Sequence, residues 1–146
     1  MSEVFGETDG LTQIRDLISR DNQPPMGRTL GIRLVDCDRG KSVFEGVPAE
    51  MHFNPMGGVH GGYAASLLDS ACGIAVHTML PPGQGFTTLE LKVSYIRGMS
   101  AETGTVRAIG RVVNMGRRVA FAEAEIRDSN DRLMATATST LLVLSK

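Results

Sequence analysis

The sequence predicts an α+β fold in which a curved antiparallel sheet wraps one long helix. Two observations support this class. First, a proline-free segment begins at Gly61-Gly62 and runs to Leu80, and it is apolar on almost every side. Second, four stretches with alternating apolar and polar residues follow this segment. A helix that is apolar all round has to be buried, and a period of two is typical of strands with one buried face. The length of 146 residues fits one ordinary domain.

The first elements along the chain are a short helix and a linker. Apolar residues with helical spacing follow Asp9-Gly10, and the run Asn22-Gln23-Pro24-Pro25 ends that helix. We therefore assign residues 1–27 to an N-terminal helix and linker, and residues 28–146 to a single domain. That domain opens with a predicted hairpin of two strands, Leu30 to Asp38 and Val43 to Val47.

Four strands are expected after the long helix, which Pro81-Pro82-Gly83 end. The joints between these strands are Arg97-Gly98, Asn114-Met115-Gly116 and the run from Asp128 to Asp131. Short joints of this kind suit hairpins between antiparallel neighbours. The four alternating stretches are Leu89 to Tyr95, Val106 to Val112, Ala120 to Ile126 and Leu133 to Leu144.

Composition excludes several classes of function. A net charge of −1 argues against a dedicated nucleic-acid-binding protein. The N-terminus is polar and acidic, unlike a secretory signal, and no window of 18 apolar residues predicts a membrane span. The cysteines, Cys37 and Cys72, and the three histidines lack a metal-ligand spacing. We expect a cytoplasmic protein without metal or cofactor.

Asp69 is the one carboxylate in the long helix. Its neighbours one turn away are small, and small neighbours leave space beside the carboxylate. Burying an unpaired charge is costly, so a carboxylate beside such a space suits a substrate pocket. The alternative is an aspartate that pairs with an arginine or accepts backbone hydrogen bonds. The small neighbours are Ala65, Ser66, Cys72 and Gly73.

Gly61 and Gly62 open the same helix, and the first amides of a helix have no partner inside it. Such amides carry a partial positive charge and can stabilise the oxyanion that forms on a thioester carbonyl. Asp69 lies about 12 Å further along the axis. One carbonyl cannot meet both groups, so the site would have to combine two subunits.

The run from Asn54 to Gly62, Asn-Pro-Met-Gly-Gly-Val-His-Gly-Gly, is followed by Leu-Asp-Ser-Ala at residues 68–71. This pattern resembles the motif of the PaaI-like hotdog thioesterases, the phenylacetate-degradation type. Gly116-Arg117-Arg118 and the final strand are also similar to that family, and the match covers about Leu30 to Leu144. The resemblance implies a hotdog fold, hydrolysis of acyl-CoA thioesters, and dimers of dimers with active sites at subunit interfaces.

The resemblance also implies residue roles. Asp69 would act as general base or nucleophile, and the Gly61 amide would bind the thioester oxygen. Asn54 and His60 would help to position the thioester. Thr88 matches a serine or threonine near the catalytic water, and Arg117 or Arg118 would meet coenzyme A phosphates. Structural alternatives stay open for three of these sites: a structural histidine at 60, turn chemistry at Asn54 and a solvated hairpin tip at Arg117-Arg118.

Other functions compete with thioester hydrolysis. His52-Phe53 before the glycine-rich loop gives slight support to a dehydratase or hydratase acting on acyl thioesters. A non-catalytic acyl-CoA sensor would need an output module, and the segment before Pro24 is too short for one. A structural protein would satisfy Asp69 internally. Val119 and Phe121 form a second apolar strand face, which predicts a homotetramer or at least a dimer.

Overall fold

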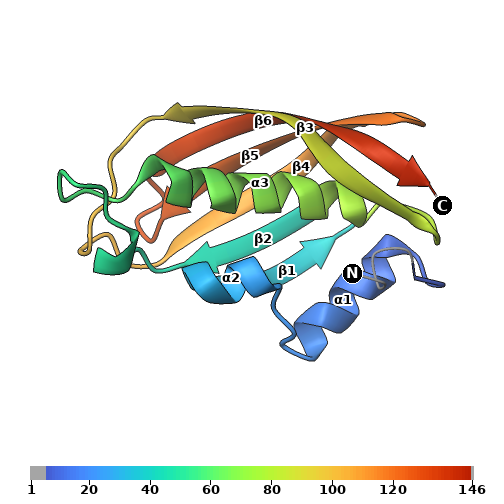
Figure 1. The fold of residues 1–146 in the computed structure, drawn as a ribbon, viewed down its shortest axis with the longest axis horizontal. Helices are drawn as coiled ribbons and strands as arrows, with labels where there is room; N and C mark the ends of the chain where they lie inside the picture. Colours follow the sequence, from blue (N-terminus) through green and yellow to red (C-terminus); the bar gives the residue numbers. More distant parts are fainter. Residues whose placement is uncertain (1–5, 146) are drawn as a thin grey trace.

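The computed structural model describes residues 6–145 and confirms the α+β class (Figure 1). Within this range no helix combines the length and the apolar character needed to cross a membrane. The helices are α1 (Gly10–Ser19), α2 (Pro25–Leu30) and α3 (Gly61–His77), and a 3-10 turn covers Glu50–His52. The strands are β1 (Ile32–Asp38), β2 (Lys41–Gly46), β3 (Gln84–Tyr95), β4 (Val106–Met115), β5 (Val119–Asp128) and β6 (Leu133–Ser145).

The described strands form one antiparallel sheet in the order β1-β2-β4-β5-β6-β3, which curves around α3 (Figure 1). The expected hairpins β1–β2, β4–β5 and β5–β6 are confirmed. The hairpin expected at Arg97-Gly98 is wrong, because β2 and β5 occupy both edges of β4. β3 therefore adds to the free edge of β6, and the chain after Tyr95 crosses the sheet to reach β4.

Small residues on the strands let the middle of α3 lie close to the sheet. An added Cβ at Gly110 would lie 2.1 Å from the carbonyl oxygen of Ala71, so β4 and the helix backbone are in direct contact. Ser42 of β2 donates a 2.7 Å hydrogen bond to the same oxygen. The sheet covers only one side of α3. The other side carries residues that are only partly buried, namely Ala65, Ser66, Asp69, Ser70 and Ile74.

The long helix ends at His77, one turn before the expected Leu80. The hydroxyl of Thr78 donates a 2.6 Å hydrogen bond to the carbonyl oxygen of Ala75. Met79 and Leu80 donate their amides to carbonyls three residues earlier, which tightens the last turn. α1 packs here: the Gly10 amide donates to the Leu80 carbonyl oxygen at 2.9 Å. The end of α3 is thus set by this packing.

The expectation that Pro25 belongs to a linker and Leu30 to a strand is wrong. Residues 25–30 form α2, which Pro25 begins and after which Gly31 adopts a left-handed conformation (φ 69°). Proline is favoured in the first turn of a helix because its missing N–H has no partner there anyway, and glycine is favoured just past the end. β1 consequently starts at Ile32.

Candidate active site

The start of α3 presents one free backbone donor. The Nδ1 atom of His60 accepts a 2.7 Å hydrogen bond from the Gly62 amide, and the His60 carbonyl accepts from the Tyr63 amide at 3.0 Å. Among the residues that the structure describes, the Gly61 amide has no partner. His60 therefore caps the helix, as its structural alternative predicted, and Gly61 keeps a donor at a positive helix end.

Gly61 is among the residues that line a cavity of about 120 Å³. The volume of this cavity is small for a whole ligand site, so it fits one part of a substrate or needs a further wall. Tyr95 and Arg97 line it, although the sequence pattern indicates Tyr95 only as part of an alternating strand. The sequence did hold a signal for a functional role of Tyr95: it ends an alternating strand with an aromatic ring that carries a hydroxyl. The other lining residues are Val59, His60, Gly61, Ala64, Ile96, Gly98, Met99, Met134 and Ala135.

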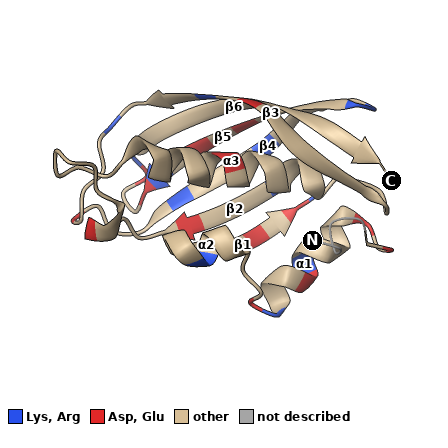
Figure 2. Cartoon of the chain, in the orientation of Figure 1, with Lys and Arg blue, Asp and Glu red and all other residues tan. Residues whose placement is uncertain are grey.

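Asp69 lies midway along α3, where Figure 2 shows an acidic position on an otherwise largely uncharged helix. Oδ1 of Asp69 accepts a 2.9 Å hydrogen bond from the Thr88 hydroxyl. The carboxylate is partly buried, and within residues 6–145 it makes no ion pair. The arginine pairing that would favour a structural role is thus not found, and Oδ2 has no hydrogen-bond partner among these residues.

A β-bulge positions Thr88 for this contact. The pairing of β3 with β6 shifts between Thr88 and Glu90, so Leu89 is the extra residue. Thr88 lies opposite buried Leu141 on the helix side of the sheet, whereas Leu89 is 57% exposed. After the bulge the inward positions are odd-numbered, and Tyr95 reaches Gly61. The regular alternation expected from Leu89 onward is therefore wrong at Leu89 itself.

Asp69 and Gly61 do not meet within one chain. Both belong to α3, eight positions apart, which is about 12 Å along the axis. Asp69 does not line the cavity at Gly61. A site in which both groups act on one carbonyl thus has to take one of the two groups from another subunit.

Asn54 organises the loop before α3. Its Oδ1 accepts hydrogen bonds from the amides of Met56 (2.9 Å) and Gly58 (3.2 Å). Its backbone also exchanges hydrogen bonds with Gly57 and Gly58. This is the turn chemistry expected of asparagine before a proline. Only the Nδ2 group of Asn54 is left for a ligand.

Arg117 and Arg118 lie in the exposed turn between β4 and β5. This turn is at the end of the sheet where α3 finishes (Figure 1): the Val112 amide donates to Gly40, whose own amide donates to Thr78. Gly61 lies at the opposite end of α3. Within one chain the structure therefore does not bring the two arginines to the Gly61 cavity.

Cys72, one turn after Asp69, is buried and free. Burial, with smaller contributions from the charges of Asp69 and Glu123, raises the pKa of its thiol to about 12. The thiolate is the nucleophilic form of cysteine, so this thiol does not compete with Asp69 as a nucleophile near neutral pH.

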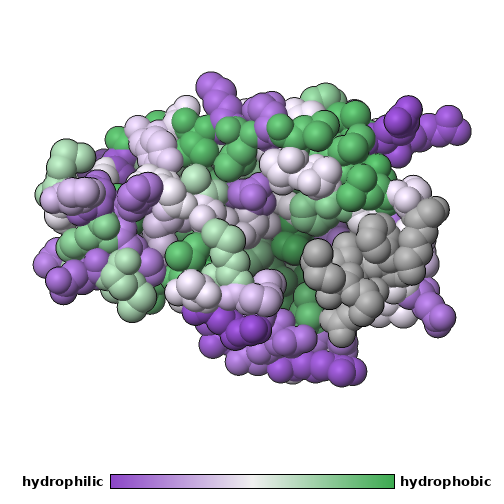
Figure 3. Space-filling model, viewed as in Figure 1, coloured by the Kyte–Doolittle hydropathy of each residue, from purple (hydrophilic) through white to green (hydrophobic). Residues whose placement is uncertain are grey.

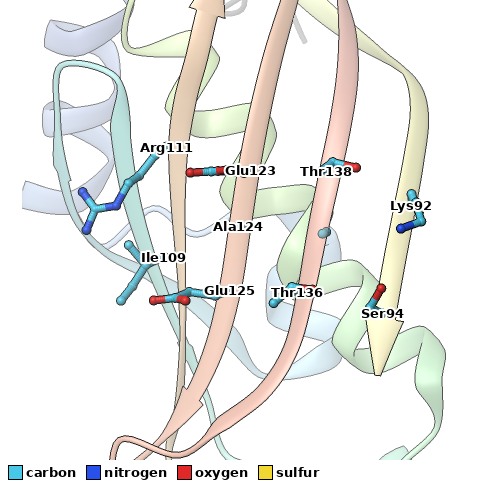
Figure 4. A pocket seen from close by; sticks show the side chains of 10 residues that line it. Lys92, Ser94, Ile109, Arg111, Glu123, Ala124, Glu125, Thr136 and Thr138 are labelled. Carbon is cyan, nitrogen blue, oxygen red and sulfur yellow. The ribbon is translucent and has the colours of Figure 1, made fainter. Parts of the chain in front are cut away.

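A hollow of about 320 Å³ lies on the outer face of the sheet, away from α3 (Figure 4). Lys92 and Arg111 flank it, and Glu123 and Glu125 lie between them. It shares no residue with the Gly61 cavity. The hollow is therefore a feature of the outer sheet face and not part of the predicted site.

Known proteins resemble this chain in sequence and in fold. Residues 56–135 match the thioesterase superfamily. A 1,4-dihydroxy-2-naphthoyl-CoA hydrolase of Listeria monocytogenes is 26% identical over 81% of this chain and 94% of that protein. The structure of a putative thioesterase from Ralstonia eutropha, a phenylacetic acid degradation-related protein, is 28% identical, with a TM-score of 0.78 over 88% of this chain and 98% of that one. The Escherichia coli PaaI structure, 20% identical, has a TM-score of 0.80 over 92% and 96% of the two chains.

Proposed function

Since this chain belongs to the thioesterase superfamily and is a PaaI-like hotdog enzyme, we propose that it hydrolyses acyl-CoA thioesters to a free acid and coenzyme A. One observation carries the proposal: Asp69 sits midway along a largely uncharged helix with one carboxylate oxygen held by Thr88 and the other free. A free carboxylate oxygen can accept a proton from water or attack a carbonyl.

The reaction follows from these groups. Asp69 either takes a proton from a water molecule that attacks the thioester carbon, or attacks that carbon itself. The carbonyl oxygen becomes an oxyanion, and the Gly61 amide stabilises it at the positive end of α3. The carbon–sulfur bond then breaks and the coenzyme A thiolate takes up a proton. On the route in which Asp69 attacks the carbon, water then hydrolyses the anhydride formed on Asp69, which releases the free acid and restores the carboxylate. Thr88 keeps the carboxylate oriented.

We propose that the active site combines two copies of this chain. β3 is an edge strand, and an unpaired edge is a template for another strand. Figure 3 shows apolar surface along the upper part of the molecule, where β3 runs, and Leu89 and Tyr95 of β3 are more than half exposed. Antiparallel pairing of two β3 edges would bury this surface and complete the small Gly61 cavity.

The contacts of β3 with α3 support a position for the two-fold axis of the proposed dimer. Thr88 is level with Asp69, and Tyr95 is level with Gly61. An axis near Leu91, between these two levels, would bring the partner subunit's Asp69 to the level of Gly61. The same rotation reverses the sheet, so the partner's Arg117 and Arg118 would come to the end where the thioester binds, within reach of coenzyme A phosphates.

The outer sheet face supports a second contact between dimers. Its hollow has positive flanks and a negative centre, so two copies related by a two-fold axis could pair Lys92 and Arg111 with Glu123 and Glu125 (Figure 4). Phe121 on the same face is 45% exposed. A homotetramer is thus our proposal for the full assembly, and a location in the cytoplasm stays a prediction from the sequence.

The structure removes the support that His52 gave to the dehydratase alternative. His52 is buried, its Nδ1 accepts from the Ala49 amide at 3.0 Å, and its Nε2 lies 2.8 Å from the Leu30 carbonyl oxygen. Its ring lies 4.2 Å from that of Tyr63. Both ring nitrogens are used by the fold, so His52 has no nitrogen left for acid–base chemistry.

A hydrolysis screen tests the proposal. Purified protein is incubated with a panel of aryl, aryl-acetyl and medium-chain acyl-CoA thioesters, and release of free thiol is followed. Aryl-CoA substrates come first because one relative is named a hydrolase of such a thioester. The protein's own two thiols are subtracted with a substrate-free control. We expect at least one substrate to turn over; no turnover across the panel would overturn the proposal.

A further inference from the structure

Two side chains make hydrogen bonds to the backbone of the segment His60-Gly61-Gly62. The His60 ring accepts the Gly62 amide. The Tyr95 hydroxyl, from the last residue of β3, donates a 2.8 Å hydrogen bond to the carbonyl oxygen of Gly61. After both bonds are made, the Gly61 amide is the group of this segment that has no partner among the described residues.

The Tyr95 ring also lies directly on Gly61. A Cβ added at residue 61 would lie 2.9 Å from the Tyr95 hydroxyl and 3.0 Å from its Cζ, so the end of the Tyr95 side chain would have to shift. Gly61 is helical and needs no glycine-specific backbone conformation. A side chain at residue 61 would therefore displace the Tyr95 ring from its place against Gly61.

We propose, building on the proposed function, that Tyr95 is a positioning residue for the oxyanion donor. Its hydrogen bond holds the Gly61–Gly62 peptide group against the edge strand, and this restrains the adjacent peptide group that carries the Gly61 amide. An oxyanion donor works because it is oriented before the reaction. Loss of the hydroxyl should therefore lower turnover more than it weakens substrate binding.

The chain offers a matched pair for the test, because it has two tyrosines. Tyr95→Phe removes the hydrogen bond and keeps the ring. Tyr63→Phe removes a hydroxyl that is buried without a partner among the described residues, in the first turn of the same helix. With an acyl-CoA that the wild type hydrolyses, we expect Tyr95→Phe to lower kcat by about 3- to 10-fold with KM unchanged. Tyr63→Phe should match the wild type.

The outcomes separate this inference from the proposed function. An inactive wild type would overturn the proposed function, and the role of Tyr95 with it. An active wild type with unchanged kcat in Tyr95→Phe, or with only KM or Tm altered, would overturn the role of Tyr95 alone.

Gly61→Ala gives a second arm. It should lose activity in the wild type but much less in a Tyr95→Ala background, because the obstructing ring is gone; equal losses in both backgrounds would contradict the inference.

Discussion

The Thr88 hydroxyl lies 2.9 Å from Oδ1 of Asp69 and joins the edge strand β3 to the middle of the central helix. This contact leaves one carboxylate oxygen of Asp69 free of hydrogen bonds within residues 6–145. It also ties the orientation of the carboxylate to a strand that we propose to lie at a subunit interface. Catalysis and assembly are thus expected to depend on the same strand.

Asp69→Asn keeps the size and the hydrogen-bond acceptor of the side chain but removes the base. We expect the fold to persist and turnover to fall by about 10²–10⁴-fold, measured as free thiol released at saturating substrate. Asp16→Asn, on the exposed side of α1, is the matched control and should behave as wild type. Near wild-type turnover in Asp69→Asn would rule out its proposed role.

Thr88→Val replaces the hydroxyl by a methyl group of similar size. Asp69 would lose its one hydrogen bond from the described residues, so we expect kcat to fall by about 3- to 10-fold while Thr88→Ser stays near wild type. Thr87→Val is the control, because the exposed Thr87 precedes it on the other face of β3. The role of Thr88 is refuted if Thr87→Val and Thr88→Val give the same rates.

Arg117→Ala and Arg118→Ala test coenzyme A binding. Phosphate contacts made equally in the ground and transition states affect KM and not kcat. We therefore expect a raised KM for acyl-CoA in at least one variant. The control is a short thioester without the nucleotide, whose kinetics should not change. If KM for acyl-CoA is unaffected in both variants, the turn is only a solvated hairpin tip.

Cysteine cross-linking locates the proposed dimer axis. In a Cys37→Ser background, cysteines at both Glu90 and Lys92, exposed on β3, should form disulfides between subunits under mild oxidation, because an axis at Leu91 places position 90 of one chain opposite position 92 of the other. A cysteine at Gln84, at the start of β3, should not, because it would lie too far from its copy. Sedimentation should give a dimer or tetramer, and a monomer at micromolar concentration would rule out the composite site.

Because His77 is buried, we expect the protein to lose stability as the pH falls. Burial lowers the pKa of His77 below its ordinary value near 6.5, and its ring nitrogen Nε2 lies 2.8 Å from the Gln13 side-chain oxygen. As pH falls below the ordinary value, the unfolded chain binds a proton that the folded protein does not, so stability falls with pH. We expect Tm to drop less between pH 7.5 and 5.5 in His77→Gln than in the wild type, whatever its absolute Tm. Equal drops would show that His77 does not carry the effect.

The sequence alone predicted the elements whose signals are local. The period of two marked the strands, and the long apolar helix with a lone carboxylate marked both α3 and Asp69. The glycines at its start predicted a free amide, which the structure locates at Gly61. The helix expected after Asp9-Gly10 is α1, and the structure shows that Asp9 caps it by accepting the Thr12 amide at 2.8 Å. Each of these features depends on residues within a turn or two of one another.

Only the tertiary structure decided which strands pair and which side chains meet. β3 lies at the edge next to β6 because β4 is already paired on both sides, and no local pattern reports the partners of a distant strand. The bulge at Leu89 changes which residues of β3 face the helix, and it brings Thr88 to Asp69 and Tyr95 to Gly61. A bulge depends on backbone hydrogen bonds to another strand, which is why regular alternation misplaced Leu89 and left Tyr95 without a role.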